Sequence, residues 1–230
     1  MAMQGTGKSK LRSRRRILDQ LTGVLGTAVG LAAGLFVCAS TATADVETGR
    51  AKAQVCAACH GPEGNSTNPL MPSLAGQPAQ ATTTQLFQFR EGNRKDPQMS
   101  PMAENLSNAD MNDLGEYFSS LKMAPSEHRT APENARLGPE LATKFNCVQC
   151  HAPALQGQQH IPRLAGQQAE YLRAQLKRFK AGTRADMDGN MTSAAQTLTD
   201  KDIGVLVDYL AGLGAVIDVE SIDKRESKFH

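Results

Sequence analysis

Apolar side chains recur every three or four residues in two stretches of the chain, residues 107–121 and 199–213. Residues at this spacing share one face of an α-helix, so each stretch predicts a helix with a single apolar side. Both stretches open with a capping signal, a Ser or Thr followed three residues later by Asp. The apolar positions are Leu114, Tyr117, Phe118 and Leu121 in the first stretch, and Leu206, Tyr209, Leu210 and Leu213 in the second.

Four more segments favour helices, and no segment favours a strand. They cover residues 46–57, 80–90, 133–147 and 168–180. Gly92 and Gly182 follow the second and fourth of these segments, and glycine is the residue that most often ends a helix. No stretch alternates convincingly between apolar and polar residues, so we expect an all-α fold.

One sequence pattern occurs twice in the chain, which indicates a duplicated domain. The segment PSLAGQ at 72–77 returns as PRLAGQ at 162–167, and Leu114 returns as Leu206 in the last predicted helix. This register divides the chain into successive parts. We expect a first domain over residues 45–124, a linker over 125–132, a second domain over 133–213 and a charged tail over 214–230.

Each half contains the pentapeptide CxxCH, as CAACH at 56–60 and CVQCH at 147–151. Two thiols separated by two residues on a helical turn can reach both vinyl groups of one porphyrin, and the adjoining histidine can bind its iron. The motifs therefore predict two covalently bound haem c groups. The expected thioether residues are Cys56, Cys59, Cys147 and Cys150, and the expected proximal ligands are His60 and His151.

Zinc sites and redox-active dithiols also use CxxC pairs, but both fit this chain less well. A histidine follows each pair directly, and the two motifs stand 91 residues apart, which is unlike a zinc site. A thioredoxin-type dithiol belongs to a βαβ pattern, which surrounds neither motif. The fifth cysteine, Cys38, lies in an N-terminal apolar stretch, so no pair is left for a structural disulfide.

The sixth iron ligand decides between an open iron that binds small molecules and a closed iron that transfers electrons. In the register of the last predicted helices, Met99 pairs with Met191, whereas Met102 pairs with Ala194. Only Met99 and Met191 give both halves the same ligand, and we expect this pair in the loops before the last helices. Met102 stays the alternative in the first half.

The remaining histidines are weaker candidates for the sixth ligand. His128 lies in the predicted linker, His230 ends the chain, and His160 aligns with a leucine in the first half. None of the three has an equivalent in the other half, so we expect solvated side chains.

A proline follows each proximal histidine at nearly the same distance, Pro72 by 12 residues and Pro162 by 11. Such a proline can fix a loop whose carbonyl accepts the imidazole Nδ1–H, which sets the ring orientation and the basicity of the ligand. The alternative is an ordinary turn proline. The recurrence in both halves favours the role beside the ligand.

The first 44 residues resemble an export signal. Six basic residues precede an uncharged run from Gln20 to Ala44, which ends in the small-x-small sequence Ala-Thr-Ala. We expect a periplasmic protein exported by the general secretory route, although SRRRIL at 13–18 also resembles a twin-arginine signal. The uncharged run is nearly long enough to span a bilayer, so an uncleaved membrane anchor is the alternative to cleavage.

Charge argues against a nucleic-acid partner. Residues 1–44 contain 6 of the 25 basic and 1 of the 23 acidic residues, which leaves 19 and 22 in the rest of the chain, a net charge of −3. Residues 45–124 have 6 basic and 9 acidic side chains, and residues 125–230 have 13 of each. The mature chain thus has no excess of positive charge for binding phosphates.

The order of these motifs resembles the cytochrome c4 family, exported dihaem cytochromes built from two class I cytochrome c domains. The resemblance covers residues 45–213 and rests on CAACHGPEGNS, PSLAGQ, QLFQFREGNR and MSPMAENLS, then on CVQCH, PRLAGQ, QLKRFKAGTR and MTSAAQTLT. It implies His/Met ligation, with the first methionine of MSPM, Met99, as ligand. The second half departs from the family's MxxM pattern because Ala194 replaces the second methionine.

The resemblance implies a non-enzymatic electron carrier between a quinol-oxidising cytochrome complex and a terminal oxidase. The alternative is a dihaem electron-transfer subunit of an oxidoreductase, such as a flavin-containing sulfide dehydrogenase. A dihaem peroxidase would need one iron that can open, which two equal ligand sets disfavour.

Overall fold

The computed structural model describes residues 44–214. The expected leader and almost all of the expected charged tail lie outside these residues. Within them the regular elements are helices, and β-pairing is confined to isolated bridges at Ser126 and between Gln158 and Ile161. The expected all-α fold is confirmed.

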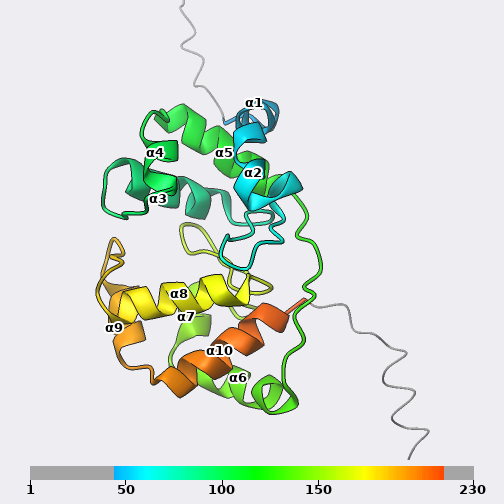
Figure 1. Cartoon of the computed structure of the whole chain (residues 1–230), viewed down its shortest axis with the longest axis vertical. Helices are drawn as coiled ribbons and strands as arrows, with labels where there is room; N and C mark the ends of the chain where they lie inside the picture. The colour runs from blue at the N-terminus through cyan, green and yellow to red at the C-terminus, as the bar shows by residue number, and fades with distance from the viewer. Residues whose placement is uncertain (1–43, 215–230) are drawn as a thin grey trace, which may run out of the picture. The chain divides into compact units, whose positions relative to one another are not determined.

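Each half has a helix at its start, a short helix at the CxxCH motif, a middle helix, a second short helix and a last helix (Figure 1). In the first half these are α1 (Val46–Lys52), α2 (Ala57–His60), α3 (Ala79–Arg90), α4 (Met99–Ala103) and α5 (Asn108–Ser120), with 3-10 turns η1 (Ala53–Val55) and η2 (Pro62–Gly64). In the second half they are α6 (Pro132–Lys144), α7 (Cys147–His151), α8 (Ala169–Lys180), α9 (Asn190–Gln196) and α10 (Asp200–Gly212).

The helix ends follow the sequence signals closely. Ser107 and Asp110 form a complete capping box at the start of α5, and Thr199 and Asp202 do the same for α10. In each box the hydroxyl accepts the backbone N–H three residues on, and the carboxylate accepts the N–H of the capping residue. The predicted starts of both last helices are confirmed.

The segment 46–57 was expected to be one helix, and this expectation is wrong. α1 ends at Lys52, and the chain continues in the 3-10 turn η1 before α2 begins at Ala57. A 3-10 turn is tighter than an α-turn, so this segment rotates the chain before the CxxCH motif. In the second half α6 reaches Lys144, and Asn146 (φ 57°) separates it from α7.

The first and last helices of each half cross at a glycine. A Cβ on Gly49 of α1 would collide with the carbonyl oxygen of Asp113 in α5. A Cβ on Gly138 of α6 would collide with Tyr209 in α10. Glycine at these positions lets the two helix backbones approach closely, which fixes where the CxxCH helix that follows can lie.

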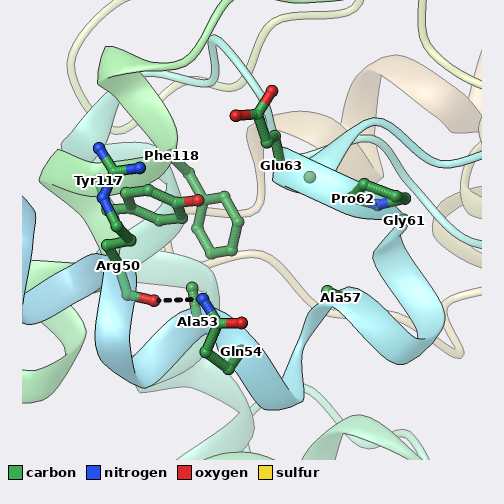
Figure 2. Close-up of a pocket in the computed structure, with 10 residues that line it drawn as sticks. Arg50, Ala53, Gln54, Ala57, Gly61, Pro62, Glu63, Tyr117 and Phe118 are labelled. Atoms are coloured by element: carbon green, nitrogen blue, oxygen red, sulfur yellow. Dashed lines mark hydrogen bonds between the residues drawn. The ribbon is translucent and has the colours of Figure 1, made fainter.

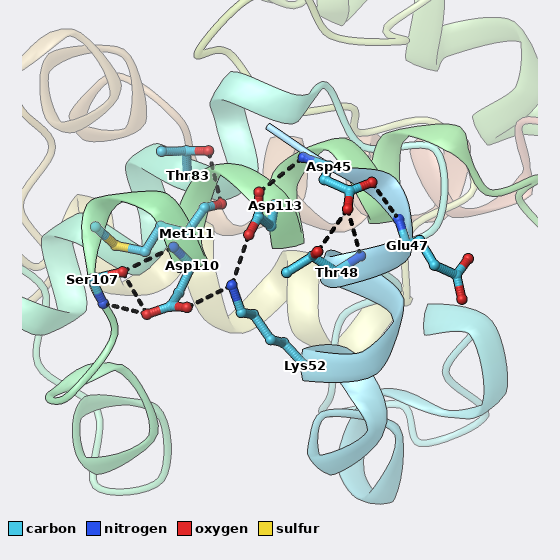
Figure 3. A network of polar contacts seen from close by, with 9 residues as sticks. All are labelled: Asp45, Glu47, Thr48, Lys52, Thr83, Ser107, Asp110, Met111 and Asp113. Atoms are coloured by element: carbon cyan, nitrogen blue, oxygen red, sulfur yellow. Dashed lines mark hydrogen bonds and ion pairs between the residues drawn. The ribbon is translucent and has the colours of Figure 1, made fainter. Parts of the chain in front are cut away.

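Polar contacts reinforce the crossing in the first half (Figure 3). Lys52 of α1 lies 2.7 Å from a carboxylate oxygen of Asp110 and 2.7 Å from one of Asp113, both on α5. The N–H of Asp45, which caps α1, also donates to Asp113 over 2.9 Å. One lysine thus joins the start of the first domain to its last helix.

The expected linker is held against the second half along most of its length. Asp208 of α10 accepts the N–H of Ala131 and the side chain of Asn134, each over 2.9 Å, and lies 2.6 Å from Nε2 of His128. Ser126 donates to the carbonyl of Ala211. These contacts fix residues 126–131 along α10.

No helix in residues 44–214 is long and apolar enough to cross a membrane.

Candidate haem sites

The CxxCH motifs form short helices at equivalent places in the two halves. Cys56 precedes α2 and Cys147 opens α7, and both side chains are half-buried, whereas Cys59 and Cys150 are exposed. Burial raises the pKa of the Cys56 and Cys147 thiols. The raised pKa values oppose thiolate formation at Cys56 and Cys147.

Each proximal histidine points its Nδ1 at a proline carbonyl. Nδ1 of His60 lies 2.8 Å from the oxygen of Pro72, and Nδ1 of His151 lies 2.7 Å from that of Pro162. Burial lowers the pKa of both rings, against the opposite effect of the proline carbonyls. A neutral ring with its proton on Nδ1 keeps a free lone pair on Nε2, which is the form that binds a metal.

The remaining nitrogen of His60 fits an iron ligand. Nε2 is buried and has no hydrogen-bond partner among the described residues. A buried nitrogen without a partner is costly, so such atoms usually have a ligand. Haem iron would satisfy this atom, and the residues around His60 therefore fit the cofactor that the sequence predicts.

The loops that contain Pro72 and Pro162 are held in the same way in both halves. In the first half the carbonyl of Gly64 accepts two backbone N–H groups of the loop, and Gly76 donates to the carbonyl of Phe118 in α5 over 2.8 Å. In the second half Leu155 and Leu210 provide the equivalent carbonyls. Each loop is thus fixed between the segment after the CxxCH helix and the last helix.

Met99 and Met191 were expected in loops, and this expectation is wrong, because each lies in the first turn of a short helix, α4 or α9. An aspartate before each helix holds the methionine's backbone. Asp96 accepts the N–H of Met99 over 3.1 Å, and Asp186 accepts the N–H of Met191 over 2.7 Å. Two extra residues between aspartate and methionine in the second half account for the register change from 90 to 92.

Three of the other methionines differ from this pair in burial, whereas Met71 and Met123 are half-buried like the pair. Met102 and Met187 expose 49% and 70% of their surface, and Met111 is fully buried in the first domain's core. Met99 and Met191 are half-buried. Of the competing histidines, His128 is engaged by Asp208 and His160 is exposed, while His230 lies outside the described residues.

A pocket of about 340 Å³ lies beside α2, between α1 and the end of α5 (Figure 2). Its lining includes Arg50, Ala57 and Glu63 together with the rings of Tyr117 and Phe118. Neither His60 nor Met99 lines it, so this pocket is separate from the expected iron ligands.

Sequence reasoning missed a set of polar side chains that cross between the two halves. Arg94 donates to Gln85 in its own half and to Tyr171 and Gln175 in the other half, and Arg184 donates to Gln175 and, across the halves, to Gln85. Although burial would raise it, the two guanidinium groups hold the pKa of Tyr171 at about 8. The pairs 85/175 and 94/184 both recur at an offset of 90, which was the available signal.

Gln77 and Gln167 also form hydrogen bonds between the two halves. They are the last residues of PSLAGQ and PRLAGQ, which were recognised only as evidence of the repeat. Gln77 bonds to the backbone of Arg163, and Gln167 bonds to the backbone of Ser73. Each repeat segment therefore holds its counterpart.

This arrangement, an all-α unit that presents a CxxCH helix and a carbonyl-bonded histidine twice, defines a cytochrome c. The family model described as "Cytochrome c" matches residues 46–122 and again residues 135–214. The chain belongs to the cytochrome c4 family, as the following relatives show.

Two similar proteins are cytochromes c4, and a third is a protein of another name. It is 38% identical to cytochrome c4 of Thiocapsa roseopersicina over 74% of this chain and 93% of that protein. The crystal structure of reduced recombinant cytochrome c4 from Pseudomonas stutzeri matches with a TM-score of 0.68 and 36% identity, over 74% of this chain and 98% of that one. The thiosulfate dehydrogenase electron acceptor of Thiomonas intermedia is 36% identical over 70% of this chain and 79% of that protein.

The chain is therefore a dihaem electron carrier with two covalently bound haem c groups.

Proposed function

We propose that His60 and Met99 are the axial ligands of one haem iron, and that His151 and Met191 are those of the other. The observation that carries this proposal is the buried, partnerless Nε2 of His60 opposite a carbonyl-bonded Nδ1. The methionine assignment rests on the matching aspartate contacts of Met99 and Met191 and on the exposure of Met102. The thioether residues would be Cys56, Cys59, Cys147 and Cys150.

A bound haem c supplies one-electron Fe(III)/Fe(II) chemistry, and the protein sets how easily that electron is taken up. With a His and a Met side chain as its protein ligands, each iron would have no position left for a substrate. The carbonyls of Pro72 and Pro162 hold each imidazole in one orientation and increase its basicity, which favours the oxidised iron. A methionine ligand would act in the other direction and raise the potential relative to two histidines.

The ligand assignment can be tested by the weak Fe–S(Met) charge-transfer absorption of the oxidised protein. Met99→Ala and Met191→Ala should each remove about half of this absorption, because each removes one sulfur ligand. Met102→Ala is the matched control and should leave it unchanged. If Met102→Ala removes the absorption of the first haem and Met99→Ala does not, the assignment in the first half is wrong.

We infer that the protein works in the periplasm and carries electrons from a quinol-oxidising cytochrome complex to a terminal oxidase. Export is supported by the basic and then uncharged N-terminal sequence, and covalent haem attachment fits that compartment. Residues 45–124 contain 6 basic and 9 acidic side chains, while residues 125–230 contain 13 of each. This difference supports docking of donor and acceptor at different domains.

A second candidate function comes from the relatives named as thiosulfate dehydrogenase electron acceptors. In this role the protein would receive electrons from a catalytic subunit, as in the sulfide dehydrogenase alternative. Purification from the native host separates the two functions. A catalytic partner in stoichiometric amount supports the subunit role, whereas free protein that the quinol-oxidising complex reduces supports the carrier role.

A further inference from the structure

The peptide bond that accepts each histidine proton also donates a hydrogen bond at its other end. The carbonyl of Pro72 and the N–H of Ser73 belong to one peptide unit. The carbonyl accepts Nδ1–H of His60 over 2.8 Å, and the N–H donates to Oε1 of Gln167 over 2.7 Å. The order is therefore imidazole, peptide, glutamine, and the glutamine comes from the other half of the molecule.

The second half contains the same chain of bonds in the opposite direction. The carbonyl of Pro162 accepts Nδ1–H of His151 over 2.7 Å, and the N–H of Arg163 donates to Oε1 of Gln77 over 2.9 Å. Gln77 and Gln167 are equivalent positions of the repeat, 90 residues apart. Each glutamine thus binds the peptide unit that holds the histidine of the other domain.

Both amide groups are fixed in orientation. Nε2 of Gln167 donates to the carbonyl of Ser73 over 2.9 Å, and Nε2 of Gln77 donates to that of Arg163 over 3.1 Å. A flipped amide would place NH₂ against N–H and oxygen against oxygen, so only one orientation satisfies both bonds. Gln77 and Gln167 are 7% and 4% exposed, and water does not compete for these bonds.

Hydrogen bonds in such a chain strengthen one another, most of all where the dielectric constant is low. A peptide whose N–H is engaged has a more negative carbonyl oxygen, which pulls harder on the imidazole Nδ1–H. The imidazole then becomes a stronger electron donor through Nε2 and stabilises the oxidised iron.

We propose that Gln77 and Gln167 are crossed positioning residues, each lowering the reduction potential of the haem bound by the opposite domain. Gln167 acts on the haem of His60, and Gln77 acts on the haem of His151. This inference rests on the proposed role of the two histidines as iron ligands.

The test uses the full dihaem protein with Gln167→Met and Gln77→Met, since methionine keeps the unbranched shape but has no amide. Gln167→Met should raise the potential of the first haem and leave the second unchanged, and Gln77→Met should do the reverse. The contact is one bond further from the iron than an ordinary ligand partner, so we expect a change of at most about tenfold in the Fe(III)/Fe(II) equilibrium, or about 59 mV.

Two measurements assign the effect to one haem. Haem methyl resonances followed by ¹H NMR during stepwise reduction give each potential separately, with assignment from Met99→Ala and Met191→Ala. The Nδ1–H resonance of each proximal histidine reports the strength of its hydrogen bond directly. In Gln167→Met the signal of His60 should move upfield and that of His151 should stay.

Two further variants separate tuning from a general loosening of the contact between the halves. Gln168→Met removes another bond between the halves, from Gln168 to the carbonyl of Ser66, and should move neither potential. Gln167→Glu keeps an acceptor oxygen for Ser73, so it should leave the first potential at or below its original value. If the contact were purely structural, Gln167→Met and Gln167→Glu would shift the reduction potential of the first haem in the same direction.

The crossed pattern of shifts supports the proposal. Equal shifts of both haems, shifts in the glutamine's own half, or unchanged potentials overturn it. The ligand proposal fails on different results. It fails if the unaltered protein lacks the Fe–S(Met) absorption, or if Met99→Ala and Met191→Ala both leave that absorption unchanged.

Discussion

The two halves hold their histidines in the same way but hold their helices together differently. In the first half the last helix meets the middle helix at Gly115, where a Cβ would lie 2.6 Å from the carbonyl oxygen of Ala79. In the second half the equivalent position is Val207, which is fully buried. The glycine allows close approach of two backbones, whereas the valine fills the space between them.

The clusters of buried apolar residues also differ between the two halves. In the first half the main cluster has four buried residues, Ala53, Leu114, Tyr117 and Phe118. In the second half it has eight, and seven of them are Leu, Ile or Val. The cluster consists of Ala142, Leu155, Leu172, Leu198, Ile203, Leu206, Val207 and Leu210. The duplicated fold thus keeps the geometry around the ligands and varies the packing that supports it.

Exchanging the residues at the equivalent positions 115 and 207 should change the free energy of unfolding most. Val207→Gly removes a buried side chain and adds a glycine to a helix, which together should cost about 3 kcal/mol. Gly115→Val should cost about 1–3 kcal/mol because the new side chain has no space between α3 and α5. Denaturant unfolding followed by circular dichroism measures both. If Gly115→Val is neutral, the two halves do not differ as described.

The glycines at the crossing of first and last helices should respond alike in both halves. Gly49→Ala and Gly138→Ala each force a Cβ against the opposite helix and should lower the free energy of unfolding by about 2 kcal/mol. Gly204→Ala in α10 is the control, because its Cβ would meet no atom within 4 Å. Removing that glycine should leave the stability unchanged or raise it by up to about 1 kcal/mol. A cost at only one crossing would show that the halves also differ there.

Acid should affect the capping aspartates of the two last helices differently. Hydrogen bonds from Lys52 and Ser107 lower the pKa of Asp110 to about 2, and its equivalent Asp202, which has no such lysine contact, also has a lowered pKa. A lowered pKa stabilises the fold above pH 4, and this contribution is lost as the pH falls toward 2. Lys52→Met should raise the pKa of Asp110, measured by NMR titration, and leave that of Asp202 in place. An unchanged Asp110 would contradict the role of Lys52.

Sequence patterns predicted the parts of the molecule that depend on local order. The Ser107 and Thr199 caps, the CxxCH helices and the helical apolar faces all follow from residues a few positions apart. The break after Lys52 was missed because no glycine or proline lies between Lys52 and Ala57, where the chain leaves α1 and enters η1. The aspartates before Met99 and Met191 were missed because the spacing differs between the halves.

The contacts between the halves depend on residues about 90 positions apart, which no local pattern predicts. Gln77, Gln167, Arg94 and Arg184 were visible only as members of a repeat. A repeated polar residue without a local role is the sign that could have identified them. The inference would have required knowing that the two repeat segments face each other.

The bonds from Gln77 and Gln167 reach only the main chain of the opposite repeat, and this has a consequence for sequence drift. A glutamine that bonds to N–H and C=O does not sense the side chain of the residue it holds. Position 73 is serine and position 163 is arginine, although both are held in the same way. After duplication the two copies could therefore accumulate different substitutions at this position, as Arg163 has done in acquiring a bond to the carbonyl of Ala75, without separating the domains.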